Sequence, residues 1–293
     1  MSLEFNILAV LPLLIRKSSY FSSEISLKYF ISQSVASIGF LFFTLISFSA
    51  LPEASNFFLC VALIFKLGVP PFHSWLARIL LVSPYKILFL IAVVQKLIPL
   101  HILSNFDIRA HIILFFNLFT FFTILFWLPA VSRVRACLLI SAWGNTIWLV
   151  SSVAISQAWG GFLVTYGLLL ATALRVIDKL NIQKLTSLAR YETSLKLLCI
   201  INFLNLAGLP PLVGFFAKLS LLKLLLRAYS LFFIFMLLNS SLLVLYAYLV
   251  ISFYALGAVA PKKPASLNVV SLAALRRTLA AASGLPLFIG FSI

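Results

Sequence analysis

Apolar segments long enough to cross a lipid bilayer follow one another along this chain, with short polar connections between them. A membrane-spanning helix needs about 20 mostly apolar residues. Of the 293 residues, 63% are hydrophobic and 10% are charged, whereas soluble domains carry about 25% charged residues. The segments lack the alternation of barrel strands, and only helices and closed barrels satisfy the backbone in lipid. The sequence therefore predicts an all-α membrane protein and excludes the soluble, disordered and disulfide-framework classes.

Proline, serine, asparagine and charged residues divide the chain into about ten predicted helices, the first and last of them short for a membrane span. The predicted helices are 3–15, 28–49, 55–81, 85–104, 110–129, 136–155, 159–177, 195–226, 229–256 and 278–293. We group them into a first helical repeat over 1–104, a second over 105–256, and a loop with a C-terminal helix over 257–293.

Basic residues greatly outnumber acidic ones, with 22 Lys and Arg against 6 Asp and Glu and a formal net charge of +16. If the predicted helices are threaded back and forth, one face of the membrane receives Arg16, Lys17, Lys28, Arg78, Lys86, Arg133, Arg135, Arg175, Lys179, Lys184, Arg190, Lys196, Lys262, Lys263, Arg276 and Arg277. The other face receives only Arg109, Lys223 and Arg227. This asymmetry predicts that the first face looks into the cytoplasm or the matrix. A polybasic nucleic-acid surface is less favoured because the charges are dispersed in ones and twos.

Three lysines belong to neither face, because Lys66, Lys96 and Lys218 each lie about ten residues, or about 15 Å, inside a predicted helix. On insertion scales a lysine at such a depth costs about 2.5 to 3.5 kcal/mol, and intramembrane charges of this kind usually have a function. The alternative is that a shifted helix boundary brings one of them near the headgroups. We predict that all three lie on a proton path.

Two of these lysines accompany helix breaks, one in each half of the chain. The predicted break residues are Gly68, Pro70 and Pro71, and Gly208, Pro210 and Pro211. Proline removes a backbone donor, and the unwound backbone that results is tolerated in a membrane only where it faces protein or water. Paired breaks in the third and eighth predicted helices are typical of inverted five-helix repeats with an ion site between them.

Glu4 is the one acidic residue inside a predicted apolar run, although a solvated position at the chain end is the alternative for it. Opposite charges favour the charged forms of both partners, so Glu4 and the three lysines form a coupled set that can carry protons. His73 is a possible relay because histidine titrates near neutral pH. Other polar side chains could hold water along this path or simply join helices: Gln33, Ser34, Gln95, His101, Ser141, Asn145, Thr146, Tyr166, Thr172, Asn202, Asn205, Tyr246 and Tyr248.

Motifs for cofactors are not found in the sequence. It contains no P-loop, no glycine-rich dinucleotide motif after a strand, and no His, Cys, Asp or Glu cluster with metal-ligand spacing. Cys60, Cys137 and Cys199 lie singly inside apolar runs. We therefore predict no cofactor and no metal site in this chain.

Five segments in order, MSLEFNILAVLPLL, SSEISLKYFISQSVAS, FKLGVPPFHSWL, VVQKLIPL and NLAGLPPLVGFFAKL, resemble the antiporter-like membrane subunits of respiratory complex I. The combination of KLG-x-PPFH-x-W with LAGLPPL-x-GF-x-x-K is specific, whereas the stretch after Gly257 carries little signature. The resemblance implies two inverted five-helix repeats, each with a discontinuous helix. It further implies that Glu4 and Lys66 form an acid–base pair, that Lys96 is the central lysine, and that Lys218 serves the second broken helix.

The function implied by this resemblance is proton translocation in the mitochondrial inner membrane, coupled to electron transfer elsewhere in complex I. The basic loops would face the matrix, and NADH, FMN, Fe–S clusters and ubiquinone would be bound by other subunits. The implied partners are other membrane-arm subunits, including neighbouring antiporter-like ones, and lipid, with no nucleic acid. A cation/proton antiporter subunit is the alternative function, and a membrane scaffold that retains ancestral lysines is the third hypothesis.

The first predicted helix departs from the family pattern, in which further helices precede the one that carries the glutamate. Here about 13 apolar residues, or roughly 20 Å of helix, fall short of the roughly 30 Å of hydrocarbon. We expect that the missing helices are either lost or supplied by a separate polypeptide.

Overall fold

The computed structural model describes residues 2–15, 20–47, 52–106, 109–153, 158–180, 193–210 and 212–257, and within these ranges it is helical, without strands. The α-helices are α1 (Ser2–Ile15), α2 (Tyr20–Ser47), α3 (Pro52–Leu67), α4 (Ser74–Val82), α5 (Tyr85–Phe89), α6 (Gln95–Leu103), α7 (Ala110–Trp127), α8 (Val134–Val153), α9 (Trp159–Lys179), α11 (Thr193–Ala207), α12 (Val213–Ala228) and α13 (Leu231–Gly257). A π-helix, η1 (Leu90–Val94), joins α5 to α6, and a 3-10 helix, η2 (Leu128–Ser132), follows α7. The prediction of an all-α protein is confirmed.

Six helical segments among the described residues are long and apolar enough to cross a membrane. They are Ser23–Ser47, Tyr85–Leu103, Ala110–Val131, Val134–Val153, Trp159–Lys179 and Leu231–Phe253. Two shorter apolar helices, Ser55–Leu67 and Ser194–Ala207, are the first parts of the broken spans. The boundaries follow the predicted ones closely, except that α2 begins at Tyr20 rather than at residue 28. The predicted helix 278–293 lies outside the described residues, and the relation between the two predicted repeats stays a prediction.

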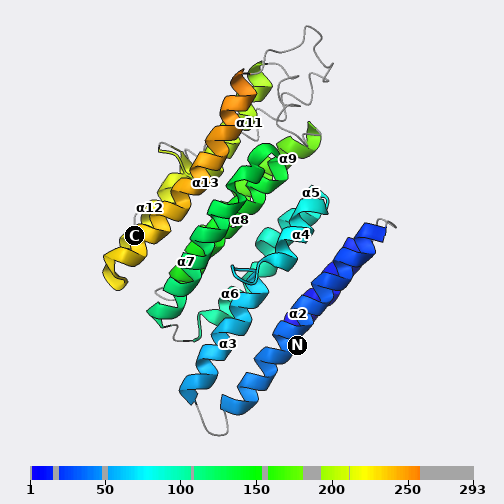
Figure 1. Cartoon of the computed structure of the whole chain (residues 1–293), viewed down its shortest axis with the longest axis vertical. Coiled ribbons are helices and arrows are strands. Elements are labelled where there is room, and N and C mark those ends of the chain that lie inside the picture. The colour runs from blue at the N-terminus through cyan, green and yellow to red at the C-terminus, as the bar shows by residue number, and fades with distance from the viewer. Residues whose placement is uncertain are drawn as a thin grey trace.

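The helices run side by side, with α2 at one edge of the molecule and α12 and α13 at the opposite edge (Figure 1). Helix α8 lies in the middle and packs against α4, α7, α9, α12 and α13. Every residue of α8 from Ala136 to Val153 is buried. The outer helices instead expose large apolar side chains, such as Leu45 on α2 and Phe253 on α13. An apolar exterior of this kind is suited to contact with lipid tails.

Both predicted helix breaks are present. Helix α3 ends at Leu67 and α4 begins at Ser74, while α11 ends at Ala207 and α12 begins at Val213. The first residue after each ending helix is a glycine with positive φ, 68° at Gly68 and 84° at Gly208. Glycine is favoured there because a Cβ strains this left-handed conformation. Each half of the chain therefore contains one discontinuous helix, as the sequence predicts.

A third interruption lies in the span 85–104, which the sequence predicts as one continuous helix. The π-helix η1 separates α5 from α6 immediately before Gln95 and Lys96. Pro99 lies inside α6 and has no N–H to donate to the carbonyl of Gln95. Single π turns inside α-helices often occur at functional positions.

Candidate functional site

Lys96 lies in the first turn of α6 and is only 2% exposed. Its Nζ donates a hydrogen bond to Oγ1 of Thr146 on α8, over 2.6 Å, and lies 5.8 Å from the centre of the Tyr166 ring on α9. Lys96 has no carboxylate within ion-pair distance among the described residues. Lys96 is thus held by a neutral hydroxyl and an aromatic face instead of an acidic side chain.

Lys66 lies next to the last residue of α3, immediately before the break, and is 6% exposed. Its Nζ has no hydrogen-bond partner among the described residues. Glu4, in the first turn of α1, is the charged group that acts on it electrostatically. The side chain of Glu4 is exposed. The structure therefore brings Glu4 and Lys66 within electrostatic range without a hydrogen bond between them.

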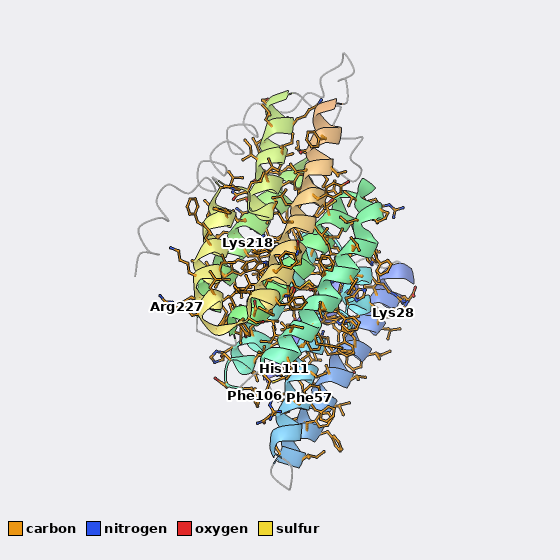
Figure 2. All side chains as sticks on the ribbon, turned by 60° about the vertical axis from the view of Figure 1, so that its left-hand side comes forward. Lys28, Phe57, Phe106, His111, Lys218 and Arg227 are labelled. Atoms are coloured by element: carbon orange, nitrogen blue, oxygen red, sulfur yellow. The ribbon has the colours of Figure 1, made fainter. Side chains whose placement is uncertain are left out.

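Lys218, in the second turn of α12, binds the second break directly. Its Nζ donates to the carbonyl oxygen of Ala207, the last residue of α11, over 2.8 Å. A Cβ on Gly208 would lie 3.2 Å from Cδ and 3.3 Å from Nζ of Lys218, so the lysine side chain passes directly over this glycine. The last carbonyls of a helix lack intrahelical donors and form the negative end of its dipole, which suits an ammonium group. Figure 2 places Lys218 within the bundle and Arg227 at its side.

The two ends of the second break are in backbone contact. The amide N–H of Gly214, in the first turn of α12, donates to Oδ1 of Asn205 on α11 over 3.1 Å. This bond satisfies one of the amides that a helix start leaves without an intrahelical acceptor. A Cβ on Gly214 would lie 2.0 Å from the carbonyl oxygen of Asn205. Asn205 and Gly214 therefore hold α11 and α12 in the arrangement that places Lys218 on Ala207.

His73 precedes α4 as its N-cap residue, beyond the first break. Its Nδ1 lies 3.0 Å from the carbonyl oxygen of Pro71, and its ring meets the ring of Trp143 edge-on, with 4.9 Å between the centres. Pro70 is buried, whereas Pro71 and Pro210 are exposed. Pro211 lies outside the described residues. The structure places His73 against α8, and its role as a relay stays a prediction.

Two residues one turn apart on α2 form hydrogen bonds beside Lys66 and Lys96. Tyr29 donates its hydroxyl to Oε1 of Gln95, the neighbour of Lys96, over 3.2 Å. Gln33 donates Nε2 to the backbone oxygen of Lys66 over 3.4 Å. Tyr29 is fully buried and is not among the candidates predicted from the sequence. Its spacing of four residues from Gln33, which puts both on one helix face, is the signal that identifies it.

Further polar side chains lie between Lys96 and the second half of the bundle. Tyr248 on α13 donates its hydroxyl to Oγ of Ser141 on α8 over 2.8 Å. The Tyr166 hydroxyl and Nδ2 of Asn145 are buried without a partner among the described residues. Buried polar groups are normally hydrogen-bonded to protein or to ordered water. The expectation that this set of residues holds water stays a prediction.

The comparisons with known proteins agree with this architecture. The sequence profile of the NADH:quinone oxidoreductase/Mrp antiporter transmembrane family matches residues 1–244. The chain belongs to this family. Its relatives include NADH-ubiquinone oxidoreductase chain 2 of Artemia franciscana, 31% identical over 225 residues, which are 74% of this chain and 70% of the relative. The protein of the same name from Paracentrotus lividus is 31% identical over 276 residues, 86% of this chain and 76% of the relative. The predicted resemblance to antiporter-like subunits of complex I is confirmed.

Solved structures share the fold of this chain. A chain of respiratory complex I from Thermus thermophilus superposes with a TM-score of 0.80 at 22% identity, covering 98% of this chain and 72% of that one. A chain of the Mrp complex from Dietzia sp. superposes with a TM-score of 0.66 at 18% identity, covering 85% of this chain and 53% of that one. At these sequence identities the likeness shows the fold alone.

Proposed function

We propose that this chain translocates protons in the membrane arm of NADH:ubiquinone oxidoreductase, along an axis formed by Glu4, Lys66, Lys96 and Lys218. One observation carries the proposal: each of the three lysines either lies next to a helix interruption or bonds to one. Lys66 comes just before the first break, Lys96 just after the π-helix, and Lys218 contacts the carbonyl that the second break leaves free. Interrupted backbone can face water within a membrane, and intramembrane lysines usually belong to ion or proton pathways.

The proposed mechanism is a sequence of electrostatic steps. A charge change in a neighbouring subunit moves the Glu4 carboxylate toward or away from Lys66. When Glu4 approaches, it favours the charged form of Lys66. A charged Lys66 then repels a second positive charge on Lys96, which favours transfer of the Lys96 proton toward Lys218. When Glu4 withdraws, Lys66 can release its proton and Lys96 can be recharged.

Electron transfer belongs to other subunits in this proposal. Among the described residues, no group of three or more His, Cys, Asp or Glu side chains is arranged to hold a metal ion. The relatives are named as NADH-ubiquinone oxidoreductase subunits. We place NADH, FMN, the Fe–S clusters and ubiquinone in partner subunits, and this chain in the mitochondrial inner membrane with its basic loops toward the matrix. The exposed side chain of Glu4 is accessible to a neighbouring subunit of the membrane arm.

Replacing Lys66 with methionine, or Glu4 with glutamine, in the assembled complex should lower proton translocation about fivefold, the effect of roughly 1 kcal/mol of coupling between two sites. The measurement is the rate of NADH-driven acidification in vesicles that contain the reconstituted complex. Lys86→Met, which removes an exposed lysine of α5, is the matched control and should pump normally. Full pumping by both Lys66→Met and a Lys66→Met/Lys96→Met double variant would falsify the proposed axis.

Cation/proton antiport is a second candidate function, favoured by the structural likeness to the Mrp complex chain. It predicts sodium-dependent proton exchange in vesicles that contain this chain and its natural partners but lack NADH-oxidising subunits. Complex I function predicts instead that the chain co-purifies with NADH-oxidising subunits and that proton movement requires NADH. The two outcomes separate the hypotheses directly.

A further inference from the structure

We infer that Thr146 is a positioning residue for Lys96. The hydroxyl oxygen of Thr146 fixes the Lys96 ammonium group against α8. The inference rests on the proposed function, because it assigns Thr146 a part in the proton path through Lys96. The two residues are 50 positions apart and meet where α6 packs against α8.

The contact between them is buried completely. Lys96 is 2% exposed and Thr146 is 1% exposed, and the N–O distance of 2.6 Å is at the short end for a hydrogen bond. All the residues of α8 around Thr146 are buried as well. An ammonium group in such surroundings depends on the few polar atoms that the protein supplies. Thr146 is uncharged, but its hydroxyl oxygen lies within hydrogen-bonding distance of Lys96 Nζ.

The direction of the hydrogen bonds gives Thr146 a defined role. A threonine hydroxyl has one proton to donate and lone pairs to accept with. Thr146 donates its proton to the carbonyl oxygen of Ala142, one turn earlier in α8. The hydroxyl therefore accepts from Lys96, and it cannot donate to a neutral amine without leaving Ala142. The bond to Ala142 also limits the rotation of the Thr146 side chain about χ1, because the hydroxyl must stay near that carbonyl.

This arrangement favours one state and one position of Lys96. An ammonium group donates up to three hydrogen bonds, and a bond from a charged donor is roughly twice as strong as a neutral one. The Tyr166 ring, 5.8 Å from Nζ, adds an aromatic face on a second side. Thr146 thus stabilises the charged form of Lys96 at its position against α8. When Lys96 releases its proton, its hydrogen bond to Thr146 becomes weaker.

Two substitutions separate the hydroxyl from the shape of the side chain. Thr146→Val keeps the branched shape and removes the oxygen, whereas Thr146→Ser keeps the oxygen and removes a methyl group. In the reconstituted complex, T146V should pump protons about tenfold more slowly, the effect of losing one hydrogen bond to a charged group. T146S should retain at least about half of the wild-type rate, because serine also has a hydroxyl that can accept. Thr120→Val is the matched control, since Thr120 is fully buried on α7 and its hydroxyl donates to the carbonyl of Asn117 in its own helix.

Pumping rates are divided by the amount of assembled complex. If T146V assembles poorly, comparing Thr146→Ala with T146S gives the same contrast between loss and retention of the hydroxyl. A Lys96→Met/T146V double variant should be no slower than Lys96→Met alone, because residues that act together are not additive. The inference is overturned if T146V pumps normally while Lys96→Met does not, or if T146S is as slow as T146V. Normal pumping by Lys96→Met would instead contradict the proposed function itself.

Discussion

Replacing Lys96 with methionine should reduce proton translocation on the order of a hundredfold, the lower range for loss of a positioned proton-transfer group. Methionine has a similar length and fills the same apolar space, so the expected loss reflects the missing amine. Helix α6, which carries Lys96, packs against α3 and α8, and no other titratable group among the described residues shares the contact of Lys96 with Thr146. The measurement is NADH-driven proton uptake by vesicles that contain the assembled complex.

A second variant of Lys96 and a control variant show whether Lys96 supplies a proton or only a charge. Lys96→Arg keeps the positive charge but cannot release a proton, because arginine remains charged in proteins. It should therefore be nearly as slow as Lys96→Met. Lys223→Met removes an exposed lysine of α12 and should pump normally. A Lys96→Arg complex that pumps at the wild-type rate would show that Lys96 contributes a fixed charge and carries no proton.

Replacing Gly214 with alanine should prevent the subunit from folding into its complex. The added Cβ would lie 2.0 Å from the backbone carbonyl oxygen of Asn205, a distance that no side-chain rotation can relieve. The helix ends would have to separate, with loss of the Gly214 to Asn205 hydrogen bond. Overpacking of this kind costs about 3 kcal/mol or more. The expected result is little or no assembled complex on a native gel, with this chain degraded.

Glycines in open positions are the controls for that experiment. A Cβ on Gly39 of α2 or Gly160 of α9 would meet no atom within 4 Å. Alanine is favoured over glycine inside helices by about 1 kcal/mol. Gly39→Ala and Gly160→Ala should therefore assemble normally. If Gly214→Ala yields normal amounts of active complex, the close approach of α11 and α12 is not required.

Most of the helical architecture could be predicted from the sequence because hydropathy and proline position act locally. The span predicted as 136–155 is observed as Val134–Val153, and the predicted breaks fall at Gly68 and Gly208. The start of α2 was placed too late because serines and charges precede Lys28. In the structure this segment is helical, and Glu24 and Lys28 pair across one turn.

The partners of the candidate residues could be predicted only in part. Burial cost identified Lys66 and Lys96 as unusual, since that cost depends on each residue's depth in its own helix. The bond from Lys96 to Thr146 and the bond from Tyr29 to Gln95 join segments 50 and 66 residues apart. Such pairings depend on how helices rotate against one another. Lys196 shows the same limit, because the sequence places it at a membrane face, in the first turn of the predicted helix 195–226, and the structure buries it in α11.

The contact between Gly214 and Asn205 also restricts how the second broken helix can move. Because the two backbones touch there, α12 cannot move closer to α11 at this point. Lys218 lies four residues further along α12, about 6 Å from this contact. A tilt of about 10° about this point would shift the backbone at Lys218 by roughly 1 Å, which is large compared with the narrow distance range of the 2.8 Å bond to Ala207. The position of this ammonium group is therefore sensitive to small rotations of one helix segment.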